Sequence, residues 1–337
     1  MHISMTGWSW SYNSLSVPNM KTTYLSDNQL SDETPCVATV GFFDGVHQGH
    51  RFLIRQVAEE AQASGMASVV VTFDRHPRQV LHADYRPQLL TTLDNKLLLL
   101  SKTGIDHAVV LHFDERMAGL SAHDFMEQVL FRQLNVRKLV VGYDNRFGHD
   151  RQDGFNDYVR YGNQLGMEVV QGKDLLLGGN HVSSSAIRIY ICQGDMEQAK
   201  QLLGYPYLIE GKVVWGMQEG RKLGFPTANL ELADACQLIP APGVYAVKVR
   251  QFQSVAMHPA MMNIGTRPTF GGTALSIEVH IFQFDEDLYG QRLYVSVEKR
   301  IREERKFDSP DLLRTQLEMD RQAVLQALDM DYLIINL

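Results

Sequence analysis

The stretch that decides the fold is Val40-Gly-Phe-Phe-Asp-Gly-Val-His-Gln-Gly-His50. An apolar run at residues 37–40 is typical of a buried strand, and the sequence Phe-Leu-Ile-Arg-Gln-Val-Ala that starts at Phe52 is typical of a helix. We therefore expect a strand, a glycine-rich turn and a helix N-terminus in succession. Helix N-termini offer free N–H groups and a partial positive charge, which suit phosphate. Nucleotide chemistry is the first hypothesis.

The side chains of this turn support that hypothesis. His47 and His50 supply donors that can hold a phosphate as charge develops. Three glycines would let the backbone approach a ligand closely: Gly41, Gly45 and Gly49. Two alternatives stay open, a metal site with His76 as a remote further ligand, and two purely structural histidines. Zinc needs a third and usually a fourth ligand, and no nearby cluster supplies them.

Length and composition set the class of protein. A chain of 337 residues fits two domains, each with its own core, and 45% hydrophobic with 21% charged residues is ordinary for a soluble globular protein. The net charge of -7 with no long basic run argues against a general nucleic-acid partner. Cys36, Cys192 and Cys236 are scattered, which indicates reduced thiols and a cytoplasmic location. No apolar run reaches membrane-spanning length.

The first half of the chain alternates strand and helix patterns. Strands are expected at residues 37–42, 68–73, 107–113, 138–142 and 168–171, and helices at 49–63, 94–102, 122–134 and 154–165. Val-rich strands separated by amphipathic helices predict a doubly wound α/β domain with a parallel sheet covered on both faces. In such sheets a ligand binds beyond the carboxyl ends of the strands, where the histidine turn falls.

The alternation of strand and helix patterns ends after residue 188. A short helix at 195–203 is followed by period-two strands at 208–214, 244–250, 260–264, 275–284 and 293–300, which predict a small antiparallel β-barrel. Ser309-Pro310 then predicts the start of a C-terminal helix. We expect a disordered extension at residues 1–20, a first domain at 21–188, a linker helix at 189–206 and a barrel domain at 207–337.

Three other segments of the first domain lie at the same predicted sheet edge. They are Phe73-Asp-Arg-His-Pro-Arg78, Gly142-Tyr-Asp-Asn-Arg-Phe-Gly148 and Val182-Ser-Ser-Ser-Ala-Ile-Arg188. The last one offers hydroxyls and an arginine at a helix opening, which is a natural anion site. Each alone is as compatible with an ordinary loop or cap, but several polar clusters at one edge favour a ligand site.

In the second domain the informative stretch is Gly216-Met-Gln-Glu-Gly-Arg-Lys-Leu-Gly-Phe-Pro-Thr-Ala-Asn229. It is not a Walker A sequence, because Leu223 follows Lys222 and the glycine spacing differs. Thr227 and Asn229 offer oxygen ligands on one side of an extended chain, which suits Mg²⁺. The glycines would permit a mobile flap over phosphates. In the strand at 275–284, Glu278 alternates with aliphatic residues and is either a solvent-facing glutamate or a general base.

Taken together, these motifs make the chain resemble the bacterial bifunctional riboflavin kinase/FMN adenylyltransferases, over residues 36–330. The resemblance rests on the G-x-F-D-G-V-H-x-G-H turn at 41–50, F-D-x-H-P-R at 73–78, the S-S-S/T-x-I-R run at 183–188 and G-F-P-T-A-N at 224–229. The turn alone would indicate only the wider nucleotidyltransferase superfamily. The chain departs from a common Glu-Asp-Phe form at 143–145, where it has Tyr-Asp-Asn.

The resemblance implies two consecutive reactions, ATP-dependent phosphorylation of riboflavin to FMN and transfer of AMP from a second ATP to give FAD and pyrophosphate. It implies that Glu278 is the kinase base and that Thr227 and Asn229 hold Mg²⁺ with ATP. His47 and His50 would act on the triphosphate. The further ATP- and phosphate-binding residues implied are Gly41, Phe43, Asp44, Gly45, Gly49, Ser184, Ser185, Arg188, Gly220 and Gly224. The flavin-binding residues implied are Asp74, His76, Pro77 and Asp144.

Two other functions are compatible with these patterns. Only one of the two activities could be retained, or the protein could be a flavin-binding sensor built on former enzyme pockets. The presence of the histidines and of Thr227, Asn229 and Glu278 counts against both. The expected small-molecule partners are riboflavin, FMN, FAD and ATP, with flavins as substrate and product rather than prosthetic group, and with no nucleic acid or membrane.

Overall fold

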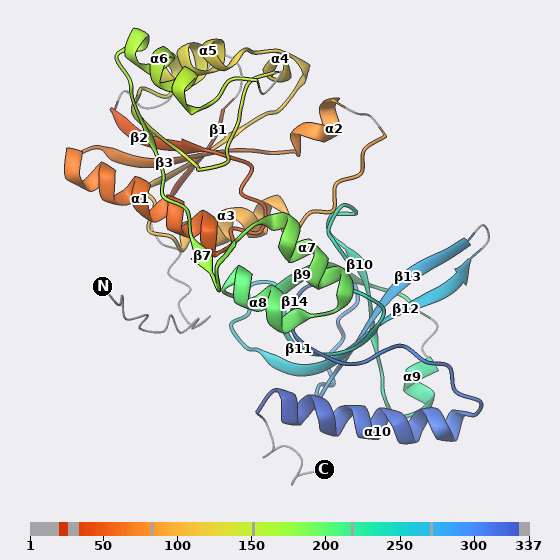
Figure 1. The fold of residues 1–337 in the computed structure, drawn as a ribbon. Coiled ribbons are helices and arrows are strands. Elements are labelled where there is room, and N and C mark those ends of the chain that lie inside the picture. Colours follow the sequence, from red (N-terminus) through yellow and green to blue (C-terminus); the bar gives the residue numbers. More distant parts are fainter. Residues whose placement is uncertain are drawn as a thin grey trace. The chain divides into compact units, whose positions relative to one another are not determined.

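The computed structural model describes residues 20–25, 34–81, 84–149, 152–216, 219–269 and 272–329 (Figure 1). The extension expected at residues 1–20 therefore lies, apart from Met20, outside the described residues. The chain divides into two compact units, and the boundary falls between Ala186 and Ile187. Each unit is described by itself.

The N-terminal unit is built on a parallel sheet with the order β1-β4-β3-β2-β5-β6. Its strands are β1 (Lys21–Leu25), β2 (Cys36–Val40), β3 (Ala67–Phe73), β4 (His107–Leu111), β5 (Val136–Val141) and β6 (Glu168–Gln171). The helices are α1 (Gln48–Ser64), α2 (Pro77–Leu81), α3 (Leu93–Ser101), α4 (Glu115–Ala118), α5 (Ala122–Asp124), the π-helix η1 (Phe125–Gln133) and α6 (Phe155–Leu165). The predicted doubly wound α/β fold is confirmed.

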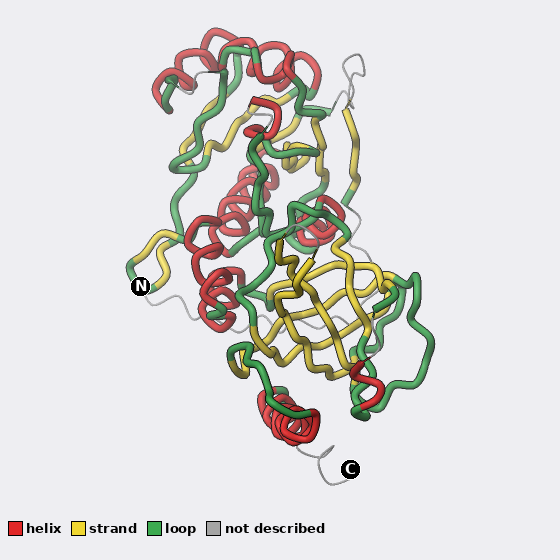
Figure 2. Tube along the Cα trace, turned by 90° about the vertical axis from the view of Figure 1, so that its right-hand side faces the viewer, coloured by secondary structure: helices red, strands yellow, loops and turns green. Residues whose placement is uncertain are grey.

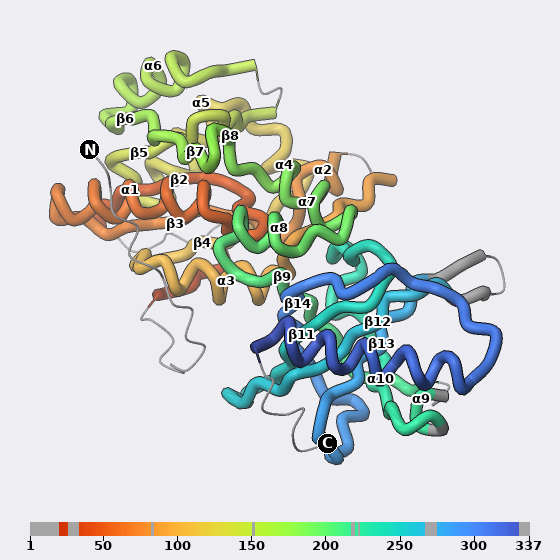
Figure 3. Tube along the Cα trace, turned by 60° about the horizontal axis from the view of Figure 1, so that its bottom comes forward, coloured from red at the N-terminus to blue at the C-terminus, as the bar shows by residue number. Residues whose placement is uncertain are grey.

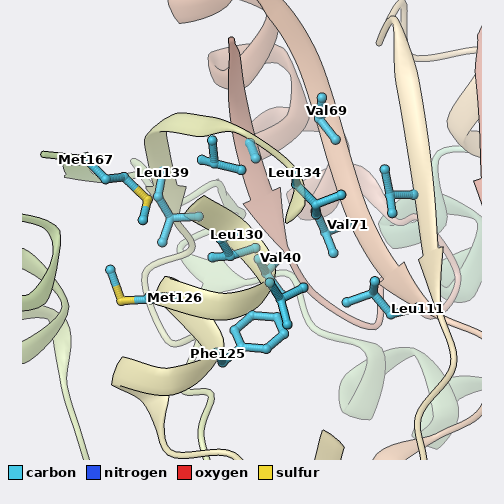
Figure 4. Close-up of a cluster of buried hydrophobic side chains, with 14 of the residues drawn as sticks. Val40, Val69, Val71, Leu111, Phe125, Met126, Leu130, Leu134, Leu139 and Met167 are labelled. Carbon is cyan, nitrogen blue, oxygen red and sulfur yellow. The ribbon is translucent and has the colours of Figure 1, made fainter. Parts of the chain in front are cut away.

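Helices cover both faces of this sheet (Figure 1). On one face, η1 and α6 pack against alternate residues of β2, β3 and β5, and the resulting cluster contains Val40, Val71, Phe125, Leu130 and Leu139 (Figure 4). On the other face, α1 contacts β2, β3 and β5 through its buried residues. Continuous burial along β2 is what a strand between two helical layers requires.

The strand order reverses at β2, and this reversal marks where a ligand crevice is expected. From β2 the sheet continues to β3 and β4 on one side and to β5 and β6 on the other. The crossovers therefore diverge at the carboxyl ends of β2 and β5, and a doubly wound sheet binds its ligand at such a point. The turn at residues 41–50 follows β2, and the loop from Gly142 follows β5.

The C-terminal unit begins with α7 (Ser184–Gln193), most of which belongs to it, and α8 (Met196–Leu203). A closed barrel follows, with the order β10-β13-β12-β11-β14-β9 (Figure 2). Its strands are β9 (Tyr207–Val214), β10 (Ala228–Leu232), β11 (Gly243–Gln251), β12 (His258–Thr269), β13 (Gly272–Ile281) and β14 (Arg292–Arg302). The short helix α9 (Glu219–Lys222) precedes β10. The predicted barrel is confirmed.

Helix α10 (Pro310–Ala327) lies along the outside of this barrel and contacts β11, β12 and β14 (Figure 3). Val324 and Leu325 of α10 pack with Phe225, Val244 and Phe282 in one buried cluster. Ser309 caps the helix by accepting a hydrogen bond from Leu312 N–H, and Pro310 stands in its first turn, as the sequence predicted.

The expected alternation along β13 is present in its centre and does not extend to its start. Ile277 and Val279 are buried inside the barrel, and Glu278 lies on the opposite, outer face. Leu275, however, is 45% exposed. It pairs with Thr266 in the part of the β12–β13 hairpin that projects past the barrel (Figure 1), so no barrel interior is left there to bury it.

Candidate active sites

The turn after β2 is held in an unusual backbone conformation. Phe43, Gly45 and Val46 have φ of 53°, 80° and 36°, in the left-handed region that side-chain-bearing residues rarely adopt. Such strain persists only where the surroundings over-determine it, and it is common at functional sites. Gly41 stays in the sheet through its N–H bond to Val71. The strain therefore begins directly beyond the end of β2.

A buried carboxylate helps to hold the turn in this strained conformation. Asp44 is 4% exposed, and its carboxylate accepts hydrogen bonds from Leu90 N–H at 2.9 Å and from Thr91 N–H at 3.1 Å. The Thr91 hydroxyl also accepts from Gly45 N–H at 3.1 Å. The Asp44 side chain thus braces the turn against the segment before α3. A carboxylate repels phosphate, so the side chain does not favour the phosphate contact predicted for Asp44, which stays a prediction.

His47 and His50 lie against each other at the start of α1. His47 is the N-cap, and its Nδ1 accepts a hydrogen bond from His50 N–H at 3.3 Å. Because Nδ1 accepts, the neutral ring of His47 carries its proton on Nε2. The two rings stack with centroids 3.5 Å apart, and Phe43 meets His50 edge-on at 5.2 Å. Both histidines therefore belong to one rigid group at a helix N-terminus.

The electrostatics of this group favour a neutral His50. Burial lowers the pKa of His50 well below its ordinary value, and the nearby His47, Lys96 and Arg51 lower it further. His50 is thus neutral at pH 7 and donates through one nitrogen only. Its Nδ1 is buried and has no hydrogen-bond partner within the described residues. A ligand oxygen or a water would satisfy a group of this kind.

Lys96 of α3 lies beside the candidate site, and the sequence did not reveal it. It is 3% exposed, and its Nζ donates to the carbonyls of Phe42 at 3.2 Å and Phe73 at 2.8 Å. The same ammonium lies 4.2 Å from the centroid of the Phe42 ring. Burial lowers the pKa of Lys96 to about 8, so the side chain is still mostly charged at pH 7. It ties the carboxyl ends of β2 and β3 together and adds positive potential there.

The metal alternative for the histidine turn gains no support. Among the described residues, the group of ligand atoms close enough to hold an ion is His123, Asp124 and Glu127, on α5 and η1. Glu127 of that group is already paired with Arg132 at 2.5 Å, and Asp124 accepts a hydrogen bond from Ser121. His47 and His50 are not part of it.

The serine run opens α7 as predicted and reaches back to the histidine turn. Ser183 accepts a hydrogen bond from Ala186 N–H, and Ser184 donates to the carbonyl of Asp44 at 2.9 Å. Ser185 is exposed in the first turn of the helix, and Arg188 lies one turn further along. The N-terminus of α7 is thus attached to the turn that carries His47. Gly49 fits beside them, since a Cβ there would lie 3.2 Å from the His47 ring and from the Val182 carbonyl.

The segment from Phe73 to Arg78 joins the ends of β3 and β4. Asp74 accepts from Phe113 N–H at 3.1 Å and pairs with His112 at 2.6 Å, so its carboxylate fixes the two strand ends. The His76 ring meets Phe42 edge-on at 4.9 Å, which brings this segment to the start of the histidine turn. Pro77 is the first residue of α2.

A cavity of about 420 Å³ borders the same segment. Its lining residues are Arg75, Gln79, Val80, Asp114 and Glu115. The predicted flavin residues Asp74, His76 and Pro77 are neighbours in sequence of this lining. Asp144 lies in the loop after β5, is exposed, and is followed by Asn145, whose side-chain amide donates to the Val40 carbonyl at 2.5 Å. That bond joins the loops after β5 and β2 at the point where the strand order reverses.

In the barrel, cross-strand pairing gathers the predicted kinase residues. Glu278 of β13 stands directly opposite Asn229 of β10, and directly opposite Asn263 of β12 on its other side. Residues that pair in this way point to the same face of a sheet. The Thr227 hydroxyl donates to Oε2 of Glu278 at 3.0 Å. A hydroxyl, two amides and a carboxylate therefore meet on the outer face of the barrel.

Each glycine of the predicted flap has a structural reason. A Cβ on Gly216 would lie 2.0 Å from the Asn229 side-chain nitrogen, and one on Gly220 would lie 2.3 Å from the Phe225 carbonyl. Gly224 has φ +85°. Phe225 N–H donates to the Gly220 carbonyl, which closes the turn after α9. These glycines shape the wall of the site, and their ATP contact stays a prediction.

An exposed aromatic pair adjoins Gly216. Trp215 is 74% exposed and stacks on Tyr289, with ring centroids 3.7 Å apart. Gly290, the next residue after Tyr289, donates to the Val213 carbonyl, which fixes this stack to the end of β9.

Two family models match the chain, one for each half. The model described as FAD synthetase matches residues 29–186, and the model described as riboflavin kinase matches residues 203–328. The chain is 38% identical to the bifunctional riboflavin kinase/FMN adenylyltransferase of Escherichia coli K12, over 85% of this chain and 90% of that protein. The chain belongs to this bifunctional family. The Listeria monocytogenes member is also 38% identical, over 90% of this chain and 96% of the relative.

A solved structure matches this member of the bifunctional riboflavin kinase/FMN adenylyltransferase family over most of its length. It is a Streptococcus pneumoniae protein described as a macrolide-efflux protein, 32% identical, with a TM-score of 0.82, covering 90% of this chain and 99% of that one. That description applies to the Streptococcus pneumoniae protein and is not carried over to this chain. The family models and the sequence relatives decide the family of this chain. No helix in the described residues is long and apolar enough to cross a membrane.

The bracing role of Asp44 can be tested by Asp44→Ala. The N–H groups of Leu90 and Thr91 would lose their acceptor, so we expect the turn and β2 to lose about 1–3 kcal/mol of local stability. Hydrogen exchange of peptides from residues 36–54 measures this loss. The control is Asp94→Ala, at an exposed position in the first turn of α3, where the lost helix-dipole interaction contributes about 0.5 kcal/mol. Equal losses in the two variants would contradict the bracing role.

Proposed function

We propose that this chain catalyses two consecutive reactions, phosphorylation of riboflavin to FMN and adenylylation of FMN to FAD. The observation that carries the proposal is that each unit gathers a complete set of groups for one reaction. Thr227, Asn229 and Glu278 meet in the barrel. In the N-terminal unit, His47 and His50 stack at the start of α1, to which Ser184 is attached through Asp44.

In the kinase reaction, Glu278 accepts the proton of the riboflavin 5′-hydroxyl as that oxygen attacks the γ-phosphorus of ATP. The bond from the γ-phosphorus to the bridging oxygen breaks, and ADP leaves. The Thr227 hydroxyl, which donates to Glu278 at 3.0 Å, fixes the orientation of the carboxylate. Phosphoryl transfer needs mainly positioning and charge neutralisation, so one base beside a phosphate-binding wall is adequate.

The donor set in the barrel fits Mg²⁺ bound with ATP. Hard oxygen ligands are what this ion prefers, and the Thr227 hydroxyl and the Asn229 amide oxygen are of that kind. Gly216 has no side chain, so its backbone can lie close to the Asn229 amide, where a Cβ would come within 2.0 Å of the amide nitrogen. When bound, the ion neutralises phosphate charge. Thr227 and Asn229 are the residues that would hold it.

In the adenylyl reaction, a phosphate oxygen of FMN attacks the α-phosphorus of a second ATP, and the bond to the β-phosphate breaks to release pyrophosphate. The FMN phosphate is already ionised, so no general base is required. Nε2–H of His47, the neutral ring of His50 and the N-terminus of α1 supply donors where negative charge develops. Ser184 and Ser185 at the start of α7 hold the departing phosphates, and Lys96 adds positive potential from behind the turn. The contact of Arg188 with these phosphates stays a prediction.

The flavin of the second reaction lies against the segment of Asp74, His76 and Pro77 and near Asp144. The supporting observation is the cavity that Arg75 and Gln79 line beside this segment. We assign residues 21–188 to the adenylyltransferase domain, 189–206 to a linker helix and 207–337 to the riboflavin kinase domain. A cytoplasmic location agrees with free thiols at Cys36, Cys192 and Cys236.

The first test is a time course with purified protein, riboflavin and Mg-ATP, in which flavins are separated by chromatography. We expect FMN to rise first and then to give way to FAD. FMN alone would remove the adenylyl reaction from the proposal. Bound flavin without any conversion would contradict the enzymatic proposal and support a flavin-binding sensor instead.

Glu278→Gln removes the base and keeps the shape of the side chain. We expect riboflavin phosphorylation to fall by about 10²–10⁴-fold, the usual contribution of a positioned base. Conversion of supplied FMN to FAD should be unchanged, because it uses groups of the other unit. Chromatography of both reactions gives the answer, and a parallel fall of the two activities would refute the assignment of one reaction to each unit.

Replacing both His47 and His50 by Ala should stop the sequence of reactions at FMN. Loss of a donor to the developing charge costs about 10²–10³-fold in rate, so FAD formation should fall at least that far. Riboflavin phosphorylation serves as the internal control, and His123→Ala, a half-exposed histidine of the same unit, is the matched variant. Undiminished FAD formation in the double variant would exclude these histidines from the reaction.

A further inference from the structure

His280 occupies a specific place beside the proposed kinase base. It follows Glu278 by two residues on β13, so both side chains lie on the outer face of the barrel. Its ring is half-buried and meets Phe225 and Phe282 edge-on, with centroids at 5.2 Å and 5.5 Å. Burial lowers the pKa of His280, so the ring is neutral at pH 7.

The ring makes one directed bond, to the segment that carries Thr227. Nδ1 of His280 lies 2.7 Å from the carbonyl oxygen of Pro226. Because a carbonyl oxygen only accepts, Nδ1 carries the proton and donates it. The next residue is Thr227, whose hydroxyl donates to Glu278 at 3.0 Å. Two hydrogen bonds therefore close a small ring between residues 226–227 and residues 278–280.

Thr227 needs such a support because the barrel ladder stops before it. The first residue of β10 is Ala228, which pairs with Val279. Pro226 has no N–H to contribute to a ladder. On the side of Pro226, the hydrogen bond from His280 thus takes the place of strand pairing.

We propose that His280 is a positioning residue of the kinase reaction, which holds Thr227 in place for Glu278 and for Mg-ATP through the Pro226 carbonyl. This inference rests on the proposed kinase function of the barrel. His280 does not touch substrate. It acts through the backbone of its neighbour, and its absence would weaken binding of Mg-ATP more than binding of riboflavin.

Two substitutions separate this role from simple packing. His280→Phe keeps an aromatic ring between Phe225 and Phe282 and loses the donor. His280→Asn loses the ring and places an amide N–H near the position of Nδ1. A packing role predicts that Phe is tolerated and Asn is not, whereas the positioning role predicts the opposite order.

The test uses the full-length chain and measures KM for Mg-ATP, KM for riboflavin and kcat of phosphorylation. For His280→Phe we expect the KM for Mg-ATP to rise about two- to tenfold, the range that one hydrogen bond supplies, with the KM for riboflavin unchanged. His280→Asn should stay within about twofold of the parent. The matched control is His258→Phe, since His258 is also half-buried and meets Phe284 edge-on at 5.1 Å.

The circular dichroism spectrum and thermal unfolding of each variant, compared with the parent, report whether its barrel is folded, because FMN-to-FAD conversion uses the other unit. A normal KM for Mg-ATP in His280→Phe, or failure of Asn to restore it, would overturn the positioning role. If the parent chain forms FMN normally in that case, the proposed kinase function stands and only the inference about His280 falls. If the parent itself forms no FMN, the proposed function fails, and the inference fails with it.

Discussion

The N-terminal site depends on one buried carboxylate and the backbone N–H groups that satisfy it. An ionised side chain that leaves water must find donors, and Asp44 finds them at Leu90 and Thr91. Those bonds hold the turn in left-handed conformations that a free chain would leave. The position of His47 at the cap of α1, and the attachment of Ser184 to the Asp44 carbonyl, both follow from that fixed turn. The turn that we propose to bind phosphate is thus organised by an acid whose own charge does not suit phosphate.

In the barrel, the register of the paired strands positions the candidate site residues. Closing the sheet places β10, β13 and β12 side by side, and their pairing sets Asn229, Glu278 and Asn263 in one row. A slip of one residue would turn Glu278 into the barrel, where aliphatic residues now pack. The hydrophobic alternation of β13 therefore fixes the chemistry as firmly as the fold. In both units, buried side chains decide where the proposed reacting groups lie.

Much of this arrangement could be predicted from the sequence, because its signals are local. The alternation of apolar residues predicted that Glu278 lies on the outer face, and Ser309 predicted the start of the last helix. The remainder depends on contacts between distant segments. The partners of Asp44 are 46 and 47 residues away, and no pattern predicts that a lone lysine in the apolar run of α3 turns inward to two carbonyls. Strand β10 was missed because it is short and directly follows Pro226-Thr227, which resembles a loop.

The stack of Trp215 on Tyr289 gives the barrel an optical reporter of its own. Trp8 and Trp10 lie outside the described residues, so Trp215 is the one tryptophan of the described part of the chain. It precedes Gly216, whose backbone rests against the Asn229 side chain. We therefore expect a rearrangement at Asn229 to change the overlap of indole and phenol, and with it the emission of the indole. With Trp8 and Trp10 replaced by Phe, ligand binding at Asn229 should be readable from the fluorescence of Trp215 without a label.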